Sequence, residues 1–246
     1  MPDTSRLTPK TSSLSGWRDP KNIRWSLRNF SILPSMMVSR GTDTHTIAKG
    51  RPHEVEDFTY EYLGKQVRLG DAMQQERMDG YIVIKDNEII FEKYFDNFSD
   101  HDHHLWASMT KSLIATAFGI AAQAFDIDET KTPADYLPEL VDSAFSEVSI
   151  RQVLNMVTAL NYTEEYEDMI PGSVHFEYFR RLGFFPDYDL MAIDPIQSDA
   201  PRGVHSMLPQ FEQADSPAIG SEFQYQSPNV DVIGMLLERV TGQSVR

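Results

Sequence analysis

Apolar positions in the first half of the chain form two short runs separated by a polar turn. Residues 81–84 and 89–95 are rich in β-branched and aromatic side chains, and the residues between them are polar. This pattern predicts a β-hairpin with its turn at 85–88. Upstream, residues 17–39 carry apolar side chains without clear periodicity, and we expect an extended arm packed on the body of the protein. Residues 1–16, rich in Ser, Thr and Pro, are expected to form a flexible tail.

Stretches with helical spacing follow in the second half. An apolar run begins just after Ser108 and predicts a helix that reaches about residue 124. Residues 229–241 carry apolar side chains at the spacing of a helix, and Gly242 supplies a stop signal. Ser149 is expected to cap a shorter helix that extends to residue 156.

The region between these helices is long and irregular. Residues 161–222 contain six prolines and many aromatic side chains. A loop region of this length inside a domain is usually functional or disordered. The aromatic content favours a folded lining, and we expect this region to shape a pocket.

Composition and charge exclude several classes of protein. The 246 residues suit one large domain or two small ones, and 41% hydrophobic with 24% charged residues indicates a globular chain. A net charge of −15 argues against nucleic acid and anionic membrane surfaces as partners. The lack of cysteine excludes disulfides and thiolate zinc sites. With no secretory signal and no apolar run long enough to span a bilayer, we expect a soluble, cytoplasmic protein.

A candidate nucleophile stands at the start of the first predicted helix. Ser108 and Lys111 are three residues apart, so on a helix they share a face with about 5–6 Å between their Cβ atoms. The lysine nitrogen can therefore lie beside the hydroxyl that must lose its proton. The unpaired N–H groups and the positive dipole of a helix start favour an anion there. The pattern is short, and a chance match is the alternative.

A candidate proton relay precedes the last predicted helix. Tyr225 stands in a segment with short polar residues, directly before the helical run. A phenol near a lysine ammonium is held closer to its anionic form, which lets it act as an acid and a base. The alternative is a buried tyrosine whose hydroxyl is satisfied by an ordinary hydrogen bond.

The two motifs in this order resemble the class C β-lactamase and esterase superfamily, which carries a Ser-x-x-Lys signature. The resemblance is closer still to the 6-aminohexanoate-dimer hydrolases, the branch that degrades nylon oligomers. The lack of a Ser-Gly pair at residues 157–160 favours that branch. The resemblance covers the chain from about residue 16 to its end and includes the stretches 16–25, 108–113, 136–140, 153–156, 161–166 and 223–232.

The resemblance implies an α+β fold of the β-lactamase and penicillin-binding-protein type, with an antiparallel sheet flanked by helices and a mostly helical insertion. Residues 17–107 would supply the N-terminal arm and the first strands. Residues 108–246 would supply the catalytic helix, a helical and loop subdomain and the helix after Tyr225. Family members continue for well over a hundred residues, so we expect the C-terminal strands and the second oxyanion N–H to be missing. Such a truncated catalytic domain is expected to fold poorly alone and to be weakly active or inactive.

The resemblance also implies roles for individual residues. Ser108 would be the nucleophile, Lys111 its base partner, and Tyr225 the proton relay to the leaving amine or alcohol. The backbone N–H of Ser108 would form half of an oxyanion hole. Tyr166 matches a tyrosine that hydrogen-bonds the substrate amide in the amide-hydrolysing branch, with a packing role as the alternative. The expected substrate contacts are Tyr166, Ser227 and Asn229.

Two polar clusters invite a metal-binding interpretation. The residues 101–104, His-Asp-His-His, are interpreted as a polar loop, because neighbouring side chains on one loop rarely converge on a metal. The acidic run from Glu164 to Asp168 lacks the twelve-residue calcium loop pattern. We expect it beside the substrate pocket, where it would attract an amine. No metal and no cofactor is implied.

These inferences predict a serine hydrolase that cleaves ester or linear amide bonds through an acyl-enzyme. The alternative is a non-catalytic member of the fold that serves as a binding or regulatory module. We expect a small-molecule ester or amide as substrate and no nucleic-acid or membrane partner, and we allow for a homodimer. Labelling of Ser108 by a reactive-serine probe separates the two alternatives.

Overall fold

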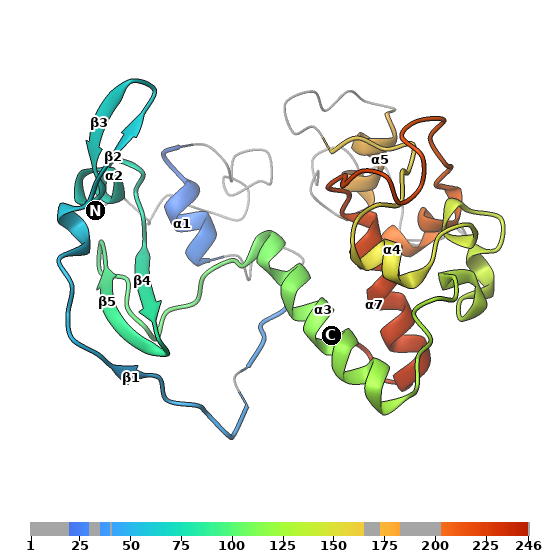
Figure 1. Ribbon diagram of the computed structural model, residues 1–246, viewed down its shortest axis with the longest axis horizontal. Helices are drawn as coiled ribbons and strands as arrows, with labels where there is room; N and C mark the ends of the chain where they lie inside the picture. The colour runs from blue at the N-terminus through green and yellow to red at the C-terminus, as the bar shows by residue number, and fades with distance from the viewer. Residues whose placement is uncertain (1–19, 30–34, 40, 165–172, 183–202, 246) are drawn as a thin grey trace, which may run out of the picture. The chain divides into compact units, whose positions relative to one another are not determined.

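In the computed structural model the chain divides into two compact units (Figure 1). The described part of the first unit ends at Leu105, and the second unit continues from Trp106. The predicted tail, residues 1–16, lies outside the described residues. The structure describes residues 20–29, 35–39, 41–164, 173–182 and 203–245.

The predicted hairpin forms in the first unit. Strand β4 (Gly80–Lys85) pairs antiparallel with β5 (Glu88–Tyr94). The two turn residues, Asp86 and Asn87, have φ angles of 52° and 61°. Two successive left-handed residues match the right-handed twist of the paired strands, so the hairpin prediction is confirmed. Strand β1 (Ala48–Lys49) runs parallel to β5, and the three-stranded sheet is therefore mixed and not purely antiparallel as expected.

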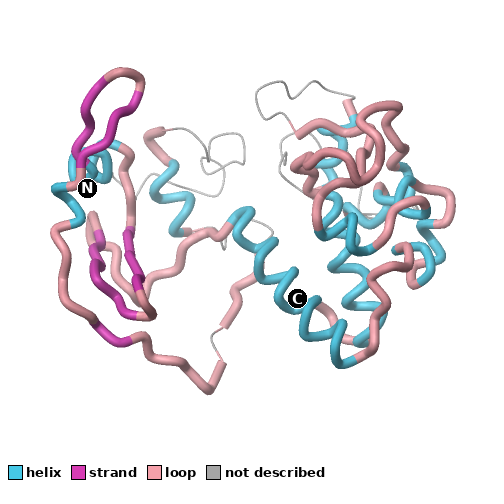
Figure 2. Tube along the Cα trace, in the orientation of Figure 1, coloured by secondary structure: helices cyan, strands magenta, loops and turns pink. Residues whose placement is uncertain are grey.

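Two further strands and a helix lie between β1 and β4 in the sequence. Strands β2 (Thr59–Tyr62) and β3 (Lys65–Arg68) form a separate antiparallel pair, and helix α2 (Leu69–Gln75) follows directly. Figure 2 shows that the strands of the described residues belong to the first unit, whereas the regular elements of the second unit are helices.

The arm expected to be extended at residues 17–39 contains a helix, α1 (Ile23–Arg28), so that prediction is wrong for this segment. Its four-residue spacing puts Arg24 and Arg28 on one face. Arg24 Nε lies 2.8 Å and Arg28 Nη2 2.5 Å from Oδ1 of Asp79, whose side chain is only 5% exposed. His104 Nε2 lies 3.2 Å from the other oxygen of that carboxylate. Charge pairing with a distant residue therefore orders α1, and local periodicity could not reveal it.

Three helices of the second unit follow their sequence signals. Helix α3 (Thr110–Ala124) occupies the predicted apolar run. Ser149 caps α4 (Ile150–Leu154), with its Oγ accepting a hydrogen bond from a backbone N–H of the first turn. Helix α7 (Pro228–Thr241) has a proline in its first turn and ends at Gly242, which has a left-handed φ of 65°. All three helices form where predicted, although α4 ends at Leu154, two residues earlier than expected.

Helix α5 (Val174–Arg181) was not predicted, because it lies in the region expected to be irregular. Ser173 begins it as an N-cap, with its Oγ 3.1 Å from the donating N–H of Phe176. Residues 165–172 and 183–202 of the same region lie outside the described residues.

The core of the second unit fixes the start of α3 relative to the segment before α7. Helices α3 and α7 lie side by side, and α4 also packs on α7 (Figure 1). Burial of each large apolar side chain stabilises the fold by about 1.5–3 kcal/mol. The large side chains buried here include Phe118, Leu137, Leu140, Phe145, Ile150, Leu160, Tyr178, Ile233 and Leu236.

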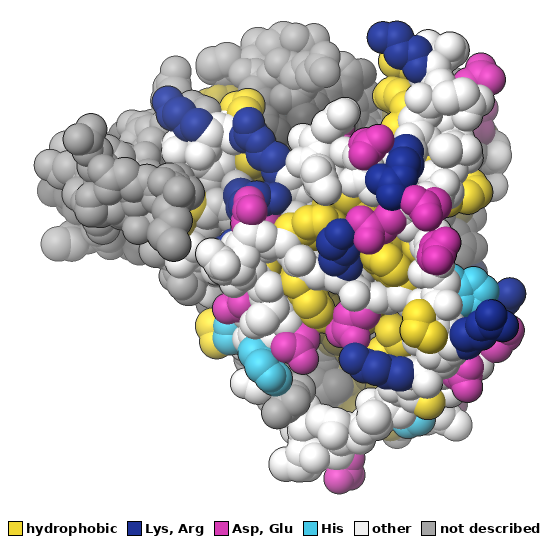
Figure 3. Space-filling view, turned by 90° about the vertical axis from the view of Figure 1, so that its left-hand side faces the viewer, with side chains coloured by type: hydrophobic (Ala, Val, Ile, Leu, Met, Phe, Trp, Pro, Cys, Tyr) yellow, Lys and Arg dark blue, Asp and Glu magenta, His cyan; other side chains and the backbone are white. Residues whose placement is uncertain are grey.

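The surface mixes charges of both signs. On the face in Figure 3, basic, acidic and hydrophobic side chains lie interspersed, and the acidic excess of the sequence does not gather there in one patch. Among the helices of the described residues, none is both long enough and apolar enough to cross a membrane.

Candidate active site

The predicted nucleophile and its base partner are in direct contact. Ser108 lies in a 3₁₀ turn, Ala107–Met109, that leads into α3, and Lys111 lies in the first turn of α3. The Nζ of Lys111 donates a hydrogen bond to Ser108 Oγ over 3.0 Å. Ser108 is exposed and Lys111 is half-buried, so the hydroxyl is open to a substrate while the lysine is partly shielded from water.

Tyr225 completes the group. The Nζ of Lys111 lies 4.8 Å from the centroid of the Tyr225 ring, a distance at which a cation is attracted to the face of an aromatic ring. The Tyr225 side chain is 39% exposed. One lysine nitrogen therefore stands between a serine hydroxyl and a phenol ring that is 117 residues further along the chain than the serine. Among the described residues, no hydrogen bond to the phenol oxygen is present.

Left-handed backbone conformations occur directly before the nucleophile and in the stretch that contacts the Tyr225 segment. Ala107, directly before the nucleophile, has a φ of 44°, and Met156 and Ala159 have φ angles of 53° and 51°. A residue with a Cβ is rarely held in this left-handed region. Met156 contacts the relay segment directly, because its carbonyl accepts a hydrogen bond from the N–H of Gln224 over 2.8 Å.

A buried amide network lies beneath Tyr225. The side chain of Gln226 is 1% exposed, and its Nε2 donates to the carbonyl oxygens of Leu160 at 3.0 Å and Tyr162 at 2.7 Å. Its Oε1 lies 3.2 Å from the Thr158 hydroxyl and 3.4 Å from the N–H of Leu160. This network could not be predicted from the sequence, since its partners are more than 60 residues apart.

The three expected substrate contacts have different outcomes. Ser227 binds Glu164 twice, with its N–H and its hydroxyl each donating to one carboxylate oxygen over 2.8 Å. Asn229 is fully buried, and its Oδ1 lies 3.0 Å from the Thr158 hydroxyl. Among the described residues its Nδ2 has no partner. Tyr166 lies outside the described residues. Substrate contact stays a prediction for all three.

A second buried pair that the sequence analysis missed lies on α5 and α7. The hydroxyl of Tyr178 donates a hydrogen bond to the carboxylate of Asp231. Burial raises the pKa of Asp231 to about 6, with the charge of Glu164 acting in the same direction. The hydrogen bond from Tyr178 and the charge of Lys111 act against this rise. Burial also raises the pKa of Tyr178 well above its ordinary value. The charge of Lys111 therefore favours the ionised form of a carboxylate that burial disfavours.

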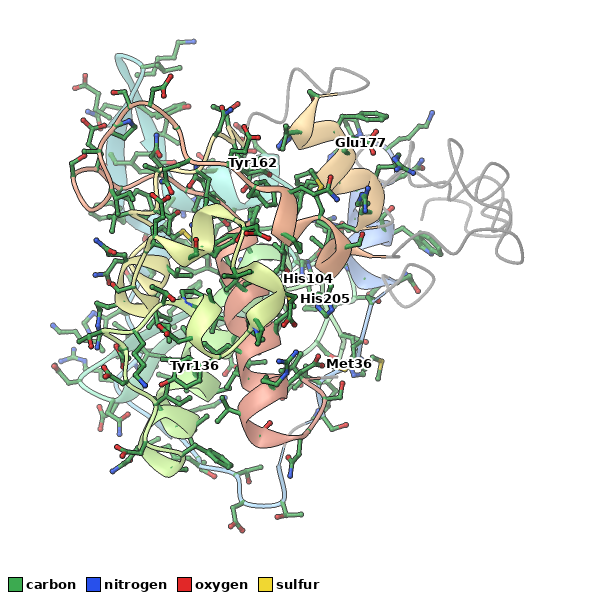
Figure 4. The ribbon with its side chains drawn as sticks, turned by 90° about the vertical axis from the view of Figure 1, so that its right-hand side faces the viewer. Met36, His104, Tyr136, Tyr162, Glu177 and His205 are labelled. Carbon is green, nitrogen blue, oxygen red and sulfur yellow. The ribbon has the colours of Figure 1, made fainter. Side chains whose placement is uncertain are left out.

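Aromatic packing holds α5 against the loop that carries Glu164. Tyr162, labelled in Figure 4, packs edge-on against Tyr178 with 5.6 Å between ring centroids. The hydroxyl of Tyr162 lies 3.0 Å from Nδ1 of the buried His175. These contacts fix the position of the Tyr178 hydroxyl, and with it the hydrogen bond to Asp231.

The clusters considered for metal binding have other partners. His104 pairs with Asp79, and His101 Nε2 lies 3.6 Å from Asp100. Within the described residues, no group of three or more histidine, aspartate and glutamate side chains is arranged to hold a metal ion. Of the acidic run, Glu164 binds Ser227 and residues 165–168 lie outside the described residues.

A surface hollow of about 320 Å³ lies elsewhere on the second unit. It is lined by Leu137, Glu139, His205, Met235, Glu238 and Arg239. These residues surround the C-terminal half of α7, whereas Tyr225 precedes its N-terminus. The hollow includes the Glu139–Arg239 ion pair of 2.7 Å and is not part of the Ser108 site.

The chain belongs to the beta-lactamase family, whose sequence pattern it matches over residues 63–246. It is 28% identical over 231 residues to the 6-aminohexanoate-dimer hydrolase of Paenarthrobacter ureafaciens, and the alignment covers 94% of this chain and 54% of that protein. A solved structure from Bacillus anthracis, provisionally assigned as a 6-aminohexanoate-dimer hydrolase, is similar with a TM-score of 0.75 at 20% identity. That match covers 96% of this chain and 60% of the other.

These comparisons confirm the predicted family resemblance and the α+β fold of the β-lactamase type. The chain spans about half the length of the curated relative that it matches. The structural likeness, at 20% identity, establishes the fold alone.

Proposed function

We propose that this chain carries the catalytic residues of a serine hydrolase that cleaves ester or linear amide bonds through an acyl-enzyme. The observation that carries the proposal is the position of the Lys111 nitrogen, 3.0 Å from Ser108 Oγ and 4.8 Å from the centre of the Tyr225 ring. A nucleophile within hydrogen-bond reach of its base is the arrangement that activates a serine hydroxyl. Family membership supports the same assignment.

Acylation follows from this arrangement. Lys111, neutral or sharing a proton with Tyr225, takes the proton of Ser108 along the 3.0 Å contact while Oγ forms a bond to the substrate carbonyl carbon. The carbonyl π electrons move to oxygen, and N–H groups at the helix start, which have no intrahelical partner, stabilise the oxyanion. The bond to the leaving group then breaks. The leaving oxygen or nitrogen takes a proton from the phenol of Tyr225, which is restored from the Lys111 ammonium.

Deacylation returns the enzyme to its starting state. Water attacks the acyl carbon, its proton passes to the Lys111 amine, and Ser108 leaves as the alcohol once it regains a proton. The steps conserve charge and need no electron donor or acceptor. Positioned acid–base groups of this kind contribute typically about 10²–10⁴-fold to the rate.

The substrate class rests on the site and on similarity. An exposed nucleophile with one amine and one phenol suits an acyl substrate whose leaving group needs a proton. The relative from Paenarthrobacter ureafaciens is named for hydrolysis of a 6-aminohexanoate dimer, which is a linear amide. We expect short-chain esters to be cleaved fastest, because esters are intrinsically more reactive than linear amides. We place a linear amide second and a β-lactam last, because the relative is named for a linear amide substrate.

A side-by-side hydrolysis assay tests this proposal. The substrates are p-nitrophenyl acetate, the linear 6-aminohexanoate dimer and the cephalosporin nitrocefin. We expect Ser108→Ala to abolish hydrolysis of all three, and Ser112→Ala, one turn further along α3, to retain it. Preferred cleavage of the cephalosporin would contradict the substrate order, and hydrolysis that survives in Ser108→Ala would contradict the mechanism.

A further inference from the structure

Gln226, the residue after the proposed relay Tyr225, is more deeply buried than the relay itself. Tyr225 is 39% exposed, whereas Gln226 is 1% exposed. A glutamine side chain offers two donors and one carbonyl oxygen. In Gln226 both ends of the amide are engaged, with the oxygen near Thr158 and Leu160 and the nitrogen on the carbonyls of Leu160 and Tyr162.

The same segment is attached on both sides of Tyr225. Before it, the N–H of Gln224 donates to Met156 over 2.8 Å. After it, Ser227 donates twice to Glu164. Every backbone neighbour of Tyr225 is thus anchored to the stretch from 156 to 164, and Gln226 supplies the buried part of that anchorage. The Tyr225 side chain is left to point at Lys111.

Because the hydrogen bonds of the Gln226 amide are buried, they hold this segment rigidly. A hydrogen bond in the interior is stronger than in water, and a buried amide that loses its partners is strongly disfavoured. The Thr158 hydroxyl, which lies 3.2 Å from Gln226, is itself fully buried. A displacement of about 1 Å at a reacting group can cost about 10²-fold in rate. The position of the phenol therefore depends on the amide beneath it.

We propose that Gln226 is a positioning residue, whose buried amide places the phenol of Tyr225 for proton transfer to the leaving group. The inference rests on the proposed function and assigns Gln226 to one of its steps. Attack by Ser108 uses Lys111, which lies on α3 and not in the segment that holds Gln226. Protonation of the leaving group uses Tyr225. Loss of the amide should therefore slow substrates whose leaving group needs a proton far more than substrates whose leaving group does not.

Two esters with one acyl group and different leaving groups make this difference measurable. In p-nitrophenyl butyrate the leaving group departs as a stable phenolate, and in ethyl butyrate the ethanol oxygen must gain a proton. The variants are Gln226→Met, which keeps the size and removes the amide, and Thr158→Val, which removes one hydroxyl of the network. Gln210→Met is the matched control, because Gln210 is exposed and its amide nitrogen donates to a single carbonyl. Tyr225→Phe gives the pattern expected for loss of the relay itself.

We expect Gln226→Met to lower kcat/KM for ethyl butyrate about tenfold more than for p-nitrophenyl butyrate, in the direction set by Tyr225→Phe. Thr158→Val should show the same bias to a smaller extent, and Gln210→Met should show none. Folding of each variant is checked by circular dichroism and thermal melting. Should Gln226→Met fail to fold, the bias in Thr158→Val decides.

Equal losses on both esters in the folded variants would overturn the positioning role while leaving the hydrolase assignment intact. Retention of ester hydrolysis in Ser108→Ala would instead remove the proposed function, and the role of Gln226 with it. A leaving-group bias absent from Tyr225→Phe itself would also overturn the inference, since the phenol would then not be the relay.

Discussion

The carboxylate of Asp231 should make the stability of the second unit depend on pH. Its pKa is raised from 3.8 to about 6, chiefly by burial. A raised folded-state pKa means that the native protein binds the proton more tightly than the unfolded chain does. This group therefore adds stability that is fully present below pH 3.8 and is lost as the pH rises through 6. A shift of about two units corresponds to at most about 3 kcal/mol.

Asp231→Asn removes this titration while keeping a side chain of the same shape for Tyr178. Urea denaturation followed by circular dichroism, at pH 4, 5, 6, 7 and 8, gives the free energy of unfolding of each form. We expect the variant to gain stability relative to the wild type by up to about 3 kcal/mol between pH 4 and pH 7, with no further change to pH 8. The matched control is Asp142→Asn, at an exposed position of the same unit, with a change under about 0.5 kcal/mol. A difference between variant and wild type that stays constant from pH 4 to pH 8 would show that the Asp231 carboxylate does not titrate with a raised pKa.

Three further predictions concern stability. Asp79→Asn removes the buried carboxylate that faces Arg24 and Arg28, and should destabilise the first unit by about 3–5 kcal/mol, seen as a lower melting temperature. Ser149→Ala removes the cap of α4 and should cost about 1 kcal/mol in urea denaturation; a midpoint equal to that of the wild type would count against the capping assignment. At the hairpin turn, Asn87→Gly should be neutral or stabilising, whereas Asn87→Val should cost about 1–3 kcal/mol, because φ at this position is 61°. The same midpoint for both Asn87 variants would contradict the left-handed turn.

Elements specified by local pattern could be predicted from the sequence. The apolar run of α3, the cap at Ser149 and the stop at Gly242 each depend on residues within a turn or two, and all three helices form where expected. The β4–β5 hairpin also follows from two adjacent runs and the turn between them. Proximity of Ser108 and Lys111 follows from helix spacing alone.

Features that depend on distant residues could not be predicted. Helix α1 is paired with Asp79, which is more than 50 residues away in the sequence, and the segment around it lacks apolar periodicity. Helix α5 has a cap signal at Ser173, but it stands among prolines that favour an irregular interpretation. The amide of Gln226 and the carboxylate of Asp231 acquire their roles only when the chain brings α5 and the stretch after residue 156 against α7.

The contact of Tyr225 with Lys111 belongs between these two groups. Each residue carries a local signal, but their meeting depends on the packing of α3 against α7. The family resemblance predicts that these two residues share one site, whereas their local patterns do not. Geometry adds what the resemblance lacked, namely the anchored segments on both sides of the phenol.

Covalent labelling with a fluorophosphonate, located by mass spectrometry of the digested protein, tests whether Ser108 is an activated nucleophile. We expect a single adduct on the peptide that contains Ser108, with a rate that falls at least about 10²-fold in Lys111→Ala. An adduct on another serine, or no adduct on protein shown to be folded by circular dichroism, would contradict this role of Ser108.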